Sequence, residues 1–158
     1  PYSRVIYLGS GPLESLARES ALKLLELTAG RVPALANTPL GFRHGPKSLL
    51  DADTLVVVLR SVEPVARRYE QDLLDELRRD GVAGQVLSVG PRAGDGEAAD
   101  FALAVPALSD PWLAPLWLTL AQRYALHRSV ALGFTPDNPF PDGTVNRVVQ
   151  GVTIHRHG

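Results

Sequence analysis

The most constraining feature of the sequence is an unbroken run at residues 54–59, TLVVVL, which is apolar after its first residue. Its three consecutive valines favour an extended chain, because β-branched side chains pack well on a pleated surface. A strand with one face in water alternates apolar and polar residues, whereas this run is apolar at successive positions. The run therefore predicts a strand buried on both faces, which is typical of a parallel sheet.

Shorter apolar runs alternate with stretches of helical spacing along the rest of the chain. We expect further strands and helices at the following residues: strands at 4–8, 32–35, 86–89 and 101–105, and helices at 13–28, 64–80 and 110–133, with a short helix opening at 45–46. This alternation predicts an α/β fold with a parallel sheet and right-handed crossovers. The 158 residues contain no linker or repeat and predict one domain. The stretch from about residue 134 is expected to lie across that domain as a tail.

Composition excludes several classes of function. The formal net charge is -1, so the charge balance calls for neither nucleic acid nor an anionic membrane as a partner. No apolar run approaches the ~20 residues of a membrane span. The chain has no Cys, which excludes disulfides, thiolate nucleophiles and sulfur-ligated zinc and suits a reducing, cytoplasmic compartment. It also has no Met, so we expect either a processed start or a piece of a longer protein.

The turn after the first predicted strand contains Gly9, Ser10 and Gly11, which is the start of a dinucleotide-binding pattern. The third glycine of that pattern is replaced by Glu14, whose carboxylate would approach a pyrophosphate. A tight turn that needs the conformational freedom of glycine is the better interpretation. Ser10 is the expected cap of the following helix.

Two sets of residues are candidates for chemistry. Glu19, Lys23 and Glu26 fall on one side of the first predicted helix, either as a solvated face with an i,i+4 ion pair or as part of a site. His44 precedes a predicted helix start, where the dipole favours the neutral imidazole that can shuttle a proton; a lone histidine before a turn is more often structural. No histidine has acidic neighbours at metal-ligand spacing, so we expect no metal site.

These candidates belong to two longer runs, ESALKLLE at residues 19–26 and GFRHGP at residues 41–46. In this order and spacing the runs resemble the second sugar isomerase (SIS) domain of phosphosugar isomerases, including the isomerase half of glucosamine-6-phosphate synthase. A closer resemblance, over nearly the whole chain, is to the tagatose-6-phosphate ketose/aldose isomerase family, which includes galactosamine-6-phosphate deaminase/isomerases. Four runs carry it: LLELTAG at 24–30, PLGFRHGPKS at 39–48, TPDNP at 135–139 and GTVNRVVQGVTIH at 143–155.

The resemblance implies a three-layer sandwich in which helices flank a five-stranded parallel sheet. Proteins of this family carry two SIS domains in tandem, and residues 1–158 resemble the second domain alone. The implied partners are a sugar-phosphate substrate and a second SIS domain, from a tandem partner or from another copy in a dimer. No metal or organic cofactor is implied. The last predicted helix has abundant apolar residues, which either form an interface with such a domain or are simply core: Trp112, Leu113, Leu116, Trp117, Leu120, Tyr124, Leu126 and Val130.

The resemblance also implies roles for the candidate residues. Glu26 matches the base that moves a proton between C1 and C2 of the open-chain sugar, a task that suits a carboxylate on a buried helix face. His44 matches the histidine that helps to open the sugar ring, which the synthase contributes across a subunit interface. Glu19 and Lys23 match residues that hold this base.

One departure from the family pattern concerns the tail. The synthase has a lysine there that forms a Schiff base with the sugar, and the matching position here is Gln150, whose amide cannot form an imine. Ring opening would then rest on His44 and hydrogen bonds, which favours the deaminase/isomerase branch. Gln150, Ser10 and Arg43 remain as residues expected to bind or support the substrate.

A second departure concerns phosphate. SIS domains that bind phosphate use a loop rich in Ser and Thr at a helix start, where hydroxyl and backbone N–H groups converge on the anion. Residues 60–64 are RSVEP here, with one hydroxyl and a carboxylate where phosphate would sit. We therefore expect the phosphate pocket of the intact enzyme to lie in the other domain.

The leading hypothesis is the catalytic-helix half of an amino-sugar-phosphate isomerase or deaminase, acting on a hexosamine 6-phosphate such as galactosamine 6-phosphate. The alternative is a non-catalytic phosphosugar-binding or dimerisation module, which would need a phosphate loop. A third possibility is a structural domain in which Glu19, Lys23 and Glu26 form a solvated stripe.

Overall fold

A computed structural model describes residues 2–92, 99–146, 148 and 151–155. Its parallel strands lie in the order β2-β1-β3-β4-β5. The predicted α/β fold with a five-stranded parallel sheet is confirmed. The elements follow one another in this order: β1 (Arg4–Gly9), α1 (Pro12–Leu27), β2 (Ala34–Asn37), α2 (Pro39–Arg43), the 3-10 helix η1 (Pro46–Leu49), β3 (Thr54–Leu59), α3 (Pro64–Asp80), β4 (Gln85–Pro91), β5 (Phe101–Leu103) and α4 (Asp110–Ala131).

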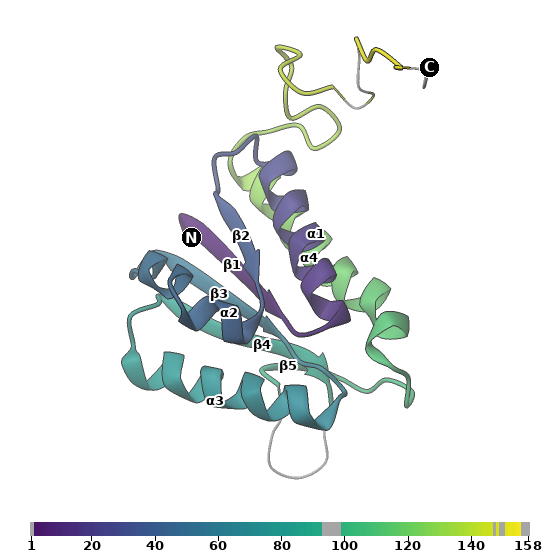
Figure 1. The fold of residues 1–158 in the computed structure, drawn as a ribbon. Coiled ribbons are helices and arrows are strands. Elements are labelled where there is room, and N and C mark those ends of the chain that lie inside the picture. The colour runs from purple at the N-terminus through teal and green to yellow at the C-terminus, as the bar shows by residue number, and fades with distance from the viewer. Residues whose placement is uncertain (1, 93–98, 147, 149–150, 156–158) are drawn as a thin grey trace.

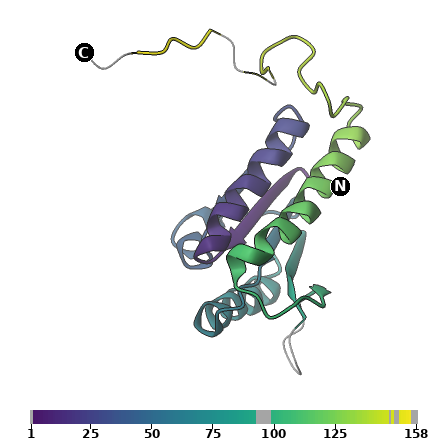
Figure 2. The ribbon, with the colours of Figure 1, turned by 90° about the vertical axis from the view of Figure 1, so that its right-hand side faces the viewer.

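The central strand β3 is buried on both faces, as its apolar run predicts. Val56 and Val58 belong to the core between the sheet and α2 and α3, whereas Leu55 and Leu59 belong to the core on the side of α1 and α4. Figures 1 and 2 show α1 and α4 side by side on one face of the sheet, and α2 and α3 lie on the other (Figure 1). The domain is therefore a three-layer sandwich.

The helix α3 spans the predicted residues because both of its ends carry strong signals. The Glu63 carboxylate accepts the N–H groups of Val65 and Ala66 at 2.9 and 2.8 Å, which caps the amino end. Gly81 adopts a left-handed φ of 62°, which ends the helix. These caps hold α3 and the loop before it at the carboxyl end of β3.

Some boundaries differ from the prediction. β2 lies two residues later than expected, and β5 ends at Leu103 rather than at residue 105. The polar segment after β2 contains the helix α2, which the sequence analysis missed. Thr38 caps this helix by accepting the Gly41 N–H at 3.0 Å, and Phe42 anchors it in the core with no exposed surface.

The expected role of Ser10 as the cap of α1 was wrong. Gly11 is the capping residue, with a φ of 53°, and no side chain caps this helix. The positive φ of Gly11 lets the chain turn into the helix directly after this glycine, so α1 begins at Pro12, one residue earlier than expected. The Ser10 side chain is therefore not used at the amino end of α1.

The tail approaches the domain only where it begins, so the expectation that it lies across the domain was wrong for its later part. The Arg31 guanidinium lies over the Phe134 ring, 5.7 Å from its centroid, and residues up to Asn146 lie beside the end of α1. Farther along, Val148 and Ile154 are 75% and 87% exposed. The chain there points away from the sandwich (Figure 2).

The long helix α4 divides its apolar residues between core and surface. Leu113 and Trp117 are buried against α1 and the sheet, whereas Trp112, Leu126 and Val130 are exposed. Some of the apolar residues that the sequence indicated on this helix thus belong to the core, and others are exposed to solvent. None of the described helices is long and apolar enough to span a membrane.

Candidate active site

The helix α1 positions the three polar residues that the sequence analysis singled out. Ala21 and Leu24 pack in the core on the inner side of the helix. At about 100° per residue, Glu19, Lys23 and Glu26 fall together outside this apolar stripe. The packing of α1 against the sheet and α4 therefore fixes the direction in which these side chains point.

Lys23 lies between the two carboxylates. Its Nζ is 2.6 Å from Glu26 Oε2 and 3.5 Å from Glu19 Oε1. The hydrogen bond to Glu26 raises the pKa of Lys23 above its ordinary value, and the charge of both glutamates adds to this effect against partial burial. Lys23 is therefore a cation that holds Glu26 by one carboxylate oxygen. The Glu26 side chain is 40% exposed, so it is less buried in this chain than expected.

A cavity of about 440 Å³ lies beside Lys23 and Glu26. Its volume is in the range of small-molecule sites. Tail residues form most of the wall, and no role was expected for them, although the TPDNP run is part of the family resemblance. These residues are Pro136, Asp137, Asn138, Pro139, Phe140, Val145 and Asn146.

The arrangement of charges beside this cavity suits proton transfer. A carboxylate can take a proton from carbon and return it to a neighbouring carbon when both lie within reach. The Lys23 ammonium holds one oxygen of the Glu26 carboxylate and places a positive charge beside the cavity. Among the described residues no group of three His, Cys, Asp or Glu side chains could hold a metal ion.

His44 is not brought to this cavity. It ends α2, whose Phe42 packs in the core on the α3 side of the sheet, whereas Glu26 lies on α1 at the opposite face. Its side chain is exposed. The end of α2 and the start of η1 meet at His44, so the dipoles of the two helices oppose each other there. The prediction for His44 considered only the helix that starts after it and did not include α2, which ends there.

Arg43 binds α3 within the chain. Its Nη2 lies 2.8 Å from Glu76 Oε2, and Lys47 forms ion pairs with the same glutamate and, at 2.6 Å, with Asp80. The hydrogen bond from Lys47 is the main cause of a lowered pKa for Glu76. These pairs fasten α2 and η1 to α3.

Ser10 lies at the other end of α1 from Glu26. It lines a second cavity, of about 390 Å³, together with Glu63 and Tyr69 among others. The Ser10 hydroxyl forms a hydrogen bond with the Glu70 carboxylate. Ser10 therefore does not line the Lys23–Glu26 cavity, and Gln150 lies outside the described residues.

Known phosphosugar enzymes match this chain in sequence. D-galactosamine-6-phosphate deaminase AgaS from Escherichia coli is 51% identical over an alignment of 158 positions that covers 98% of this chain. The chain is homologous to AgaS. It spans 41% of the length of that relative. Glutamine--fructose-6-phosphate aminotransferase from Caulobacter vibrioides is 32% identical over 139 residues, covering 85% of this chain and 22% of that protein. No family model matches the sequence.

The fold agrees with the homology to AgaS. The crystal structure of tagatose-6-phosphate ketose/aldose isomerase from Escherichia coli matches with a TM-score of 0.85 and 45% identity, covering 99% of this chain and 40% of that chain. The predicted relationship to this group of enzymes and the SIS fold are confirmed. Both the AgaS relative and this isomerase are named as sugar-phosphate enzymes.

Proposed function

We propose that this chain is the part of a hexosamine-6-phosphate deaminase/isomerase that supplies the general base. The observation that carries the proposal is the Lys23–Glu26 pair, 2.6 Å apart, beside a cavity of about 440 Å³. The supporting comparison is the 51% identity to AgaS, a D-galactosamine-6-phosphate deaminase. The substrate is galactosamine 6-phosphate in this proposal.

The chemistry begins with the open-chain aldehyde of the sugar. Glu26 removes the proton from C2, and the electron pair forms the C1–C2 double bond of an enolamine as the aldehyde oxygen takes up a proton. Returning a proton to C1 leaves an imine at C2. Water then adds to C2 and ammonia leaves, which yields the ketose phosphate. The ion pair with Lys23 keeps the Glu26 carboxylate aligned with the two carbons. This alignment matters because small misalignments slow proton transfer strongly.

His44 would complete the site from a second SIS domain. Within one chain it lies across the sheet from Glu26. The exposed Trp112, Leu126 and Val130 of α4 offer apolar surface for such a contact. We assign residues 1–158 to the second domain of a tandem pair, in a cytoplasmic enzyme that works as a dimer and releases ammonia by hydrolysis.

The test is an assay of the full-length protein for ammonia and ketose phosphate from galactosamine 6-phosphate. Glu26→Gln keeps the shape of the side chain and removes its basicity, so we expect turnover to fall by about 10²-fold or more. Glu14→Gln is the matched control, because Glu14 is a glutamate of the same helix that pairs with Arg18. Undiminished turnover in Glu26→Gln would remove Glu26 as the base.

The separation of Glu26 from His44 in this chain favours one alternative, a non-catalytic phosphosugar-binding or dimerisation module. Such a module would bind phosphosugars by itself. Titration of the 158-residue chain with hexose and hexosamine 6-phosphates distinguishes the two functions. Tight binding by this chain alone, with no turnover by the full-length protein, would favour the module.

A further inference from the structure

The loop at residues 60–63 has the position and the donors of an oxyanion site. It connects the carboxyl end of β3 to the amino end of α3. Backbone N–H groups and the positive end of a helix dipole meet in such a loop, which is where phosphate and carboxylate groups bind in parallel α/β folds.

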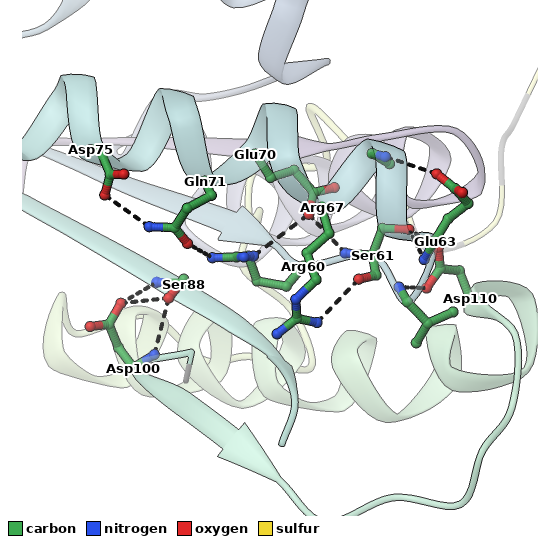
Figure 3. A network of polar contacts seen from close by, with 12 residues as sticks. Arg60, Ser61, Glu63, Arg67, Glu70, Gln71, Asp75, Ser88, Asp100 and Asp110 are labelled. Atoms are coloured by element: carbon green, nitrogen blue, oxygen red, sulfur yellow. Dashed lines mark hydrogen bonds and ion pairs between the residues drawn. The ribbon is translucent and has the colours of Figure 1, made fainter. Parts of the chain in front are cut away.

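Asp110, the first residue of α4, accepts hydrogen bonds from two donors of this loop. Its Oδ1 accepts the Val62 N–H at 2.9 Å, and its Oδ2 accepts the Ser61 hydroxyl at 2.5 Å. Figure 3 shows the Asp110 and Ser61 side chains directed toward one another. Asp110 is only 5% exposed and Ser61 only 1%. The Asp110 carboxylate thus satisfies both of these donors of the loop.

Two further carboxylates of the chain accept the neighbouring donors. The Ser61 N–H donates to Glu70 Oε2 at 2.9 Å. At the start of α3, the Glu63 carboxylate accepts two backbone N–H groups at 2.8 and 2.9 Å. The N–H of Glu63 itself donates to Ser61 Oγ at 2.9 Å. These N–H and hydroxyl groups would donate to a phosphate bound at this end of α3. They already donate to acceptors within the chain.

The charge around the loop also opposes a second anion. Arg60 is buried beside Glu70, with Nε 3.7 Å from Oε2, and its Nη1 donates to Gln71 at 2.6 Å. Burial raises the pKa of Glu70, and the negative charge of Asp110 adds to this increase. A phosphate dianion would therefore meet three carboxylates, Asp110, Glu63 and Glu70, where protein interiors pair charges with opposite ones.

We propose that the loop at residues 60–63 is an oxyanion-binding loop whose ligand is the chain's own Asp110. The carboxylate of α4 takes the place that a free phosphate or a phosphosugar would take. Asp110 thereby joins the carboxyl end of β3 to the start of α4. This inference rests on contacts within the chain and does not depend on the proposed deaminase activity.

A first test asks whether the loop accepts a free anion. Inorganic phosphate is titrated into the ¹⁵N-labelled 158-residue chain while the amide signals are followed by NMR. We expect no saturable shift of the Ser61 and Val62 amides, because Asp110 and Glu70 already accept their hydrogen bonds. A saturable shift of these two amides would overturn the proposal, and this test needs no variant.

A second test removes the internal anion. Asp110→Ala leaves the buried Ser61 hydroxyl and the Val62 N–H without their acceptor, so we expect the melting temperature to fall by about 10 °C. Formate, a free carboxylate small enough for the vacated place, is expected to restore the melting temperature in a saturable way. If the alanine variant does not fold, Asp110→Asn, which is isosteric and uncharged, is used for the melting temperature alone; we then expect a smaller fall and no effect of formate, because the amide fills the place of the carboxylate.

Asp142→Ala is the matched control. Asp142 also accepts one backbone N–H and one hydroxyl, both from Thr144, but on the exposed tail. We expect no change in its melting temperature and no effect of formate beyond that on the wild-type chain. An equal effect of formate on all three proteins would be a general salt effect and would overturn the proposal, as would an unchanged melting temperature in the Asp110 variants.

Discussion

At the scale of single residues, Glu76 is the point where two parts of the chain are fastened together. Its carboxylate forms ion pairs with Arg43, whose Nη2 lies 2.8 Å from Oε2, and with Lys47. Both cations come from the short segment of α2 and η1 that carries His44 between them. The position of His44 on the surface therefore depends on a carboxylate of α3 that the sequence analysis did not single out.

This arrangement predicts a stability difference that depends on pH. The pKa of Glu76 in the folded chain is lowered, chiefly by the hydrogen bond from Lys47. Ionised Glu76 therefore stabilises the folded chain fully at a pH above its pKa in the unfolded chain, near 4.5. This stabilisation is lost as the pH falls through the lower pKa of the folded chain. We expect Glu76→Gln to cost about 0.5–1 kcal/mol at pH 7, since partly exposed pairs are screened by solvent.

Urea denaturation of the wild-type chain and Glu76→Gln at pH 7 and at pH 3 measures this effect. The difference between the two proteins is expected to be smaller at pH 3 than at pH 7, because the contribution of the ion pairs to stability decreases once the pH falls below the unfolded pKa of glutamate. A difference of equal size at both pH values would show that lost packing, and not the ion pairs, causes the destabilisation.

At the scale of elements, the local signals in the sequence decide which helices are predictable. α3 has a capping residue, a proline at its start and a left-handed glycine at its end, and its bounds were predicted correctly. α2 has only five residues. Its start carries a local signal, the Thr38 cap followed by Pro39, but the burial of Phe42 beneath α3 that holds it in place is contained in no short-range pattern. The periodicity of the sequence predicts helices and strands, but it does not predict which distant segments of the chain are in contact.

The same distinction applies to the candidate site. Glu19, Lys23 and Glu26 are neighbours on one helix, so their grouping follows from helical spacing and is found in the structure. The wall that the tail adds beside Glu26 joins residues far apart in the chain. The Asp110 carboxylate reaches the loop at 60–63 in the same way, from a helix that begins almost fifty residues later.

The Glu63 cap makes a prediction for α3. Glu63→Ala removes the acceptor of the Val65 and Ala66 N–H groups, so we expect a loss of about 1 kcal/mol and a fall in melting temperature of about 2–4 °C. Glu63→Asp is the control, because aspartate is a preferred capping residue and should keep most of the stability. Equal melting temperatures for wild type and Glu63→Ala would mean that solvent replaces the cap without loss.

At the scale of the whole molecule, the sheet separates the two residues to which the family resemblance assigns chemistry. Glu26 belongs to the layer of α1 and α4, and His44 belongs to the layer of α2 and α3. A layer of buried strands lies between them, so side-chain rotation within one chain cannot bring them together. Two SIS domains that pack α1 of one against α2 of the other would place His44 of one domain beside Glu26 of the other.

This geometry predicts that two inactive full-length variants restore each other. In a symmetric dimer with sites shared between copies, a mixed dimer of Glu26→Gln and His44→Asn has one site with both native residues and one site with neither. Half of the dimers in an equal mixture are mixed, so we expect about a quarter of the wild-type activity after co-expression. Each variant alone should be nearly inactive. Activity of the mixture no higher than that of the single variants would exclude a site that Glu26 and His44 of two copies share.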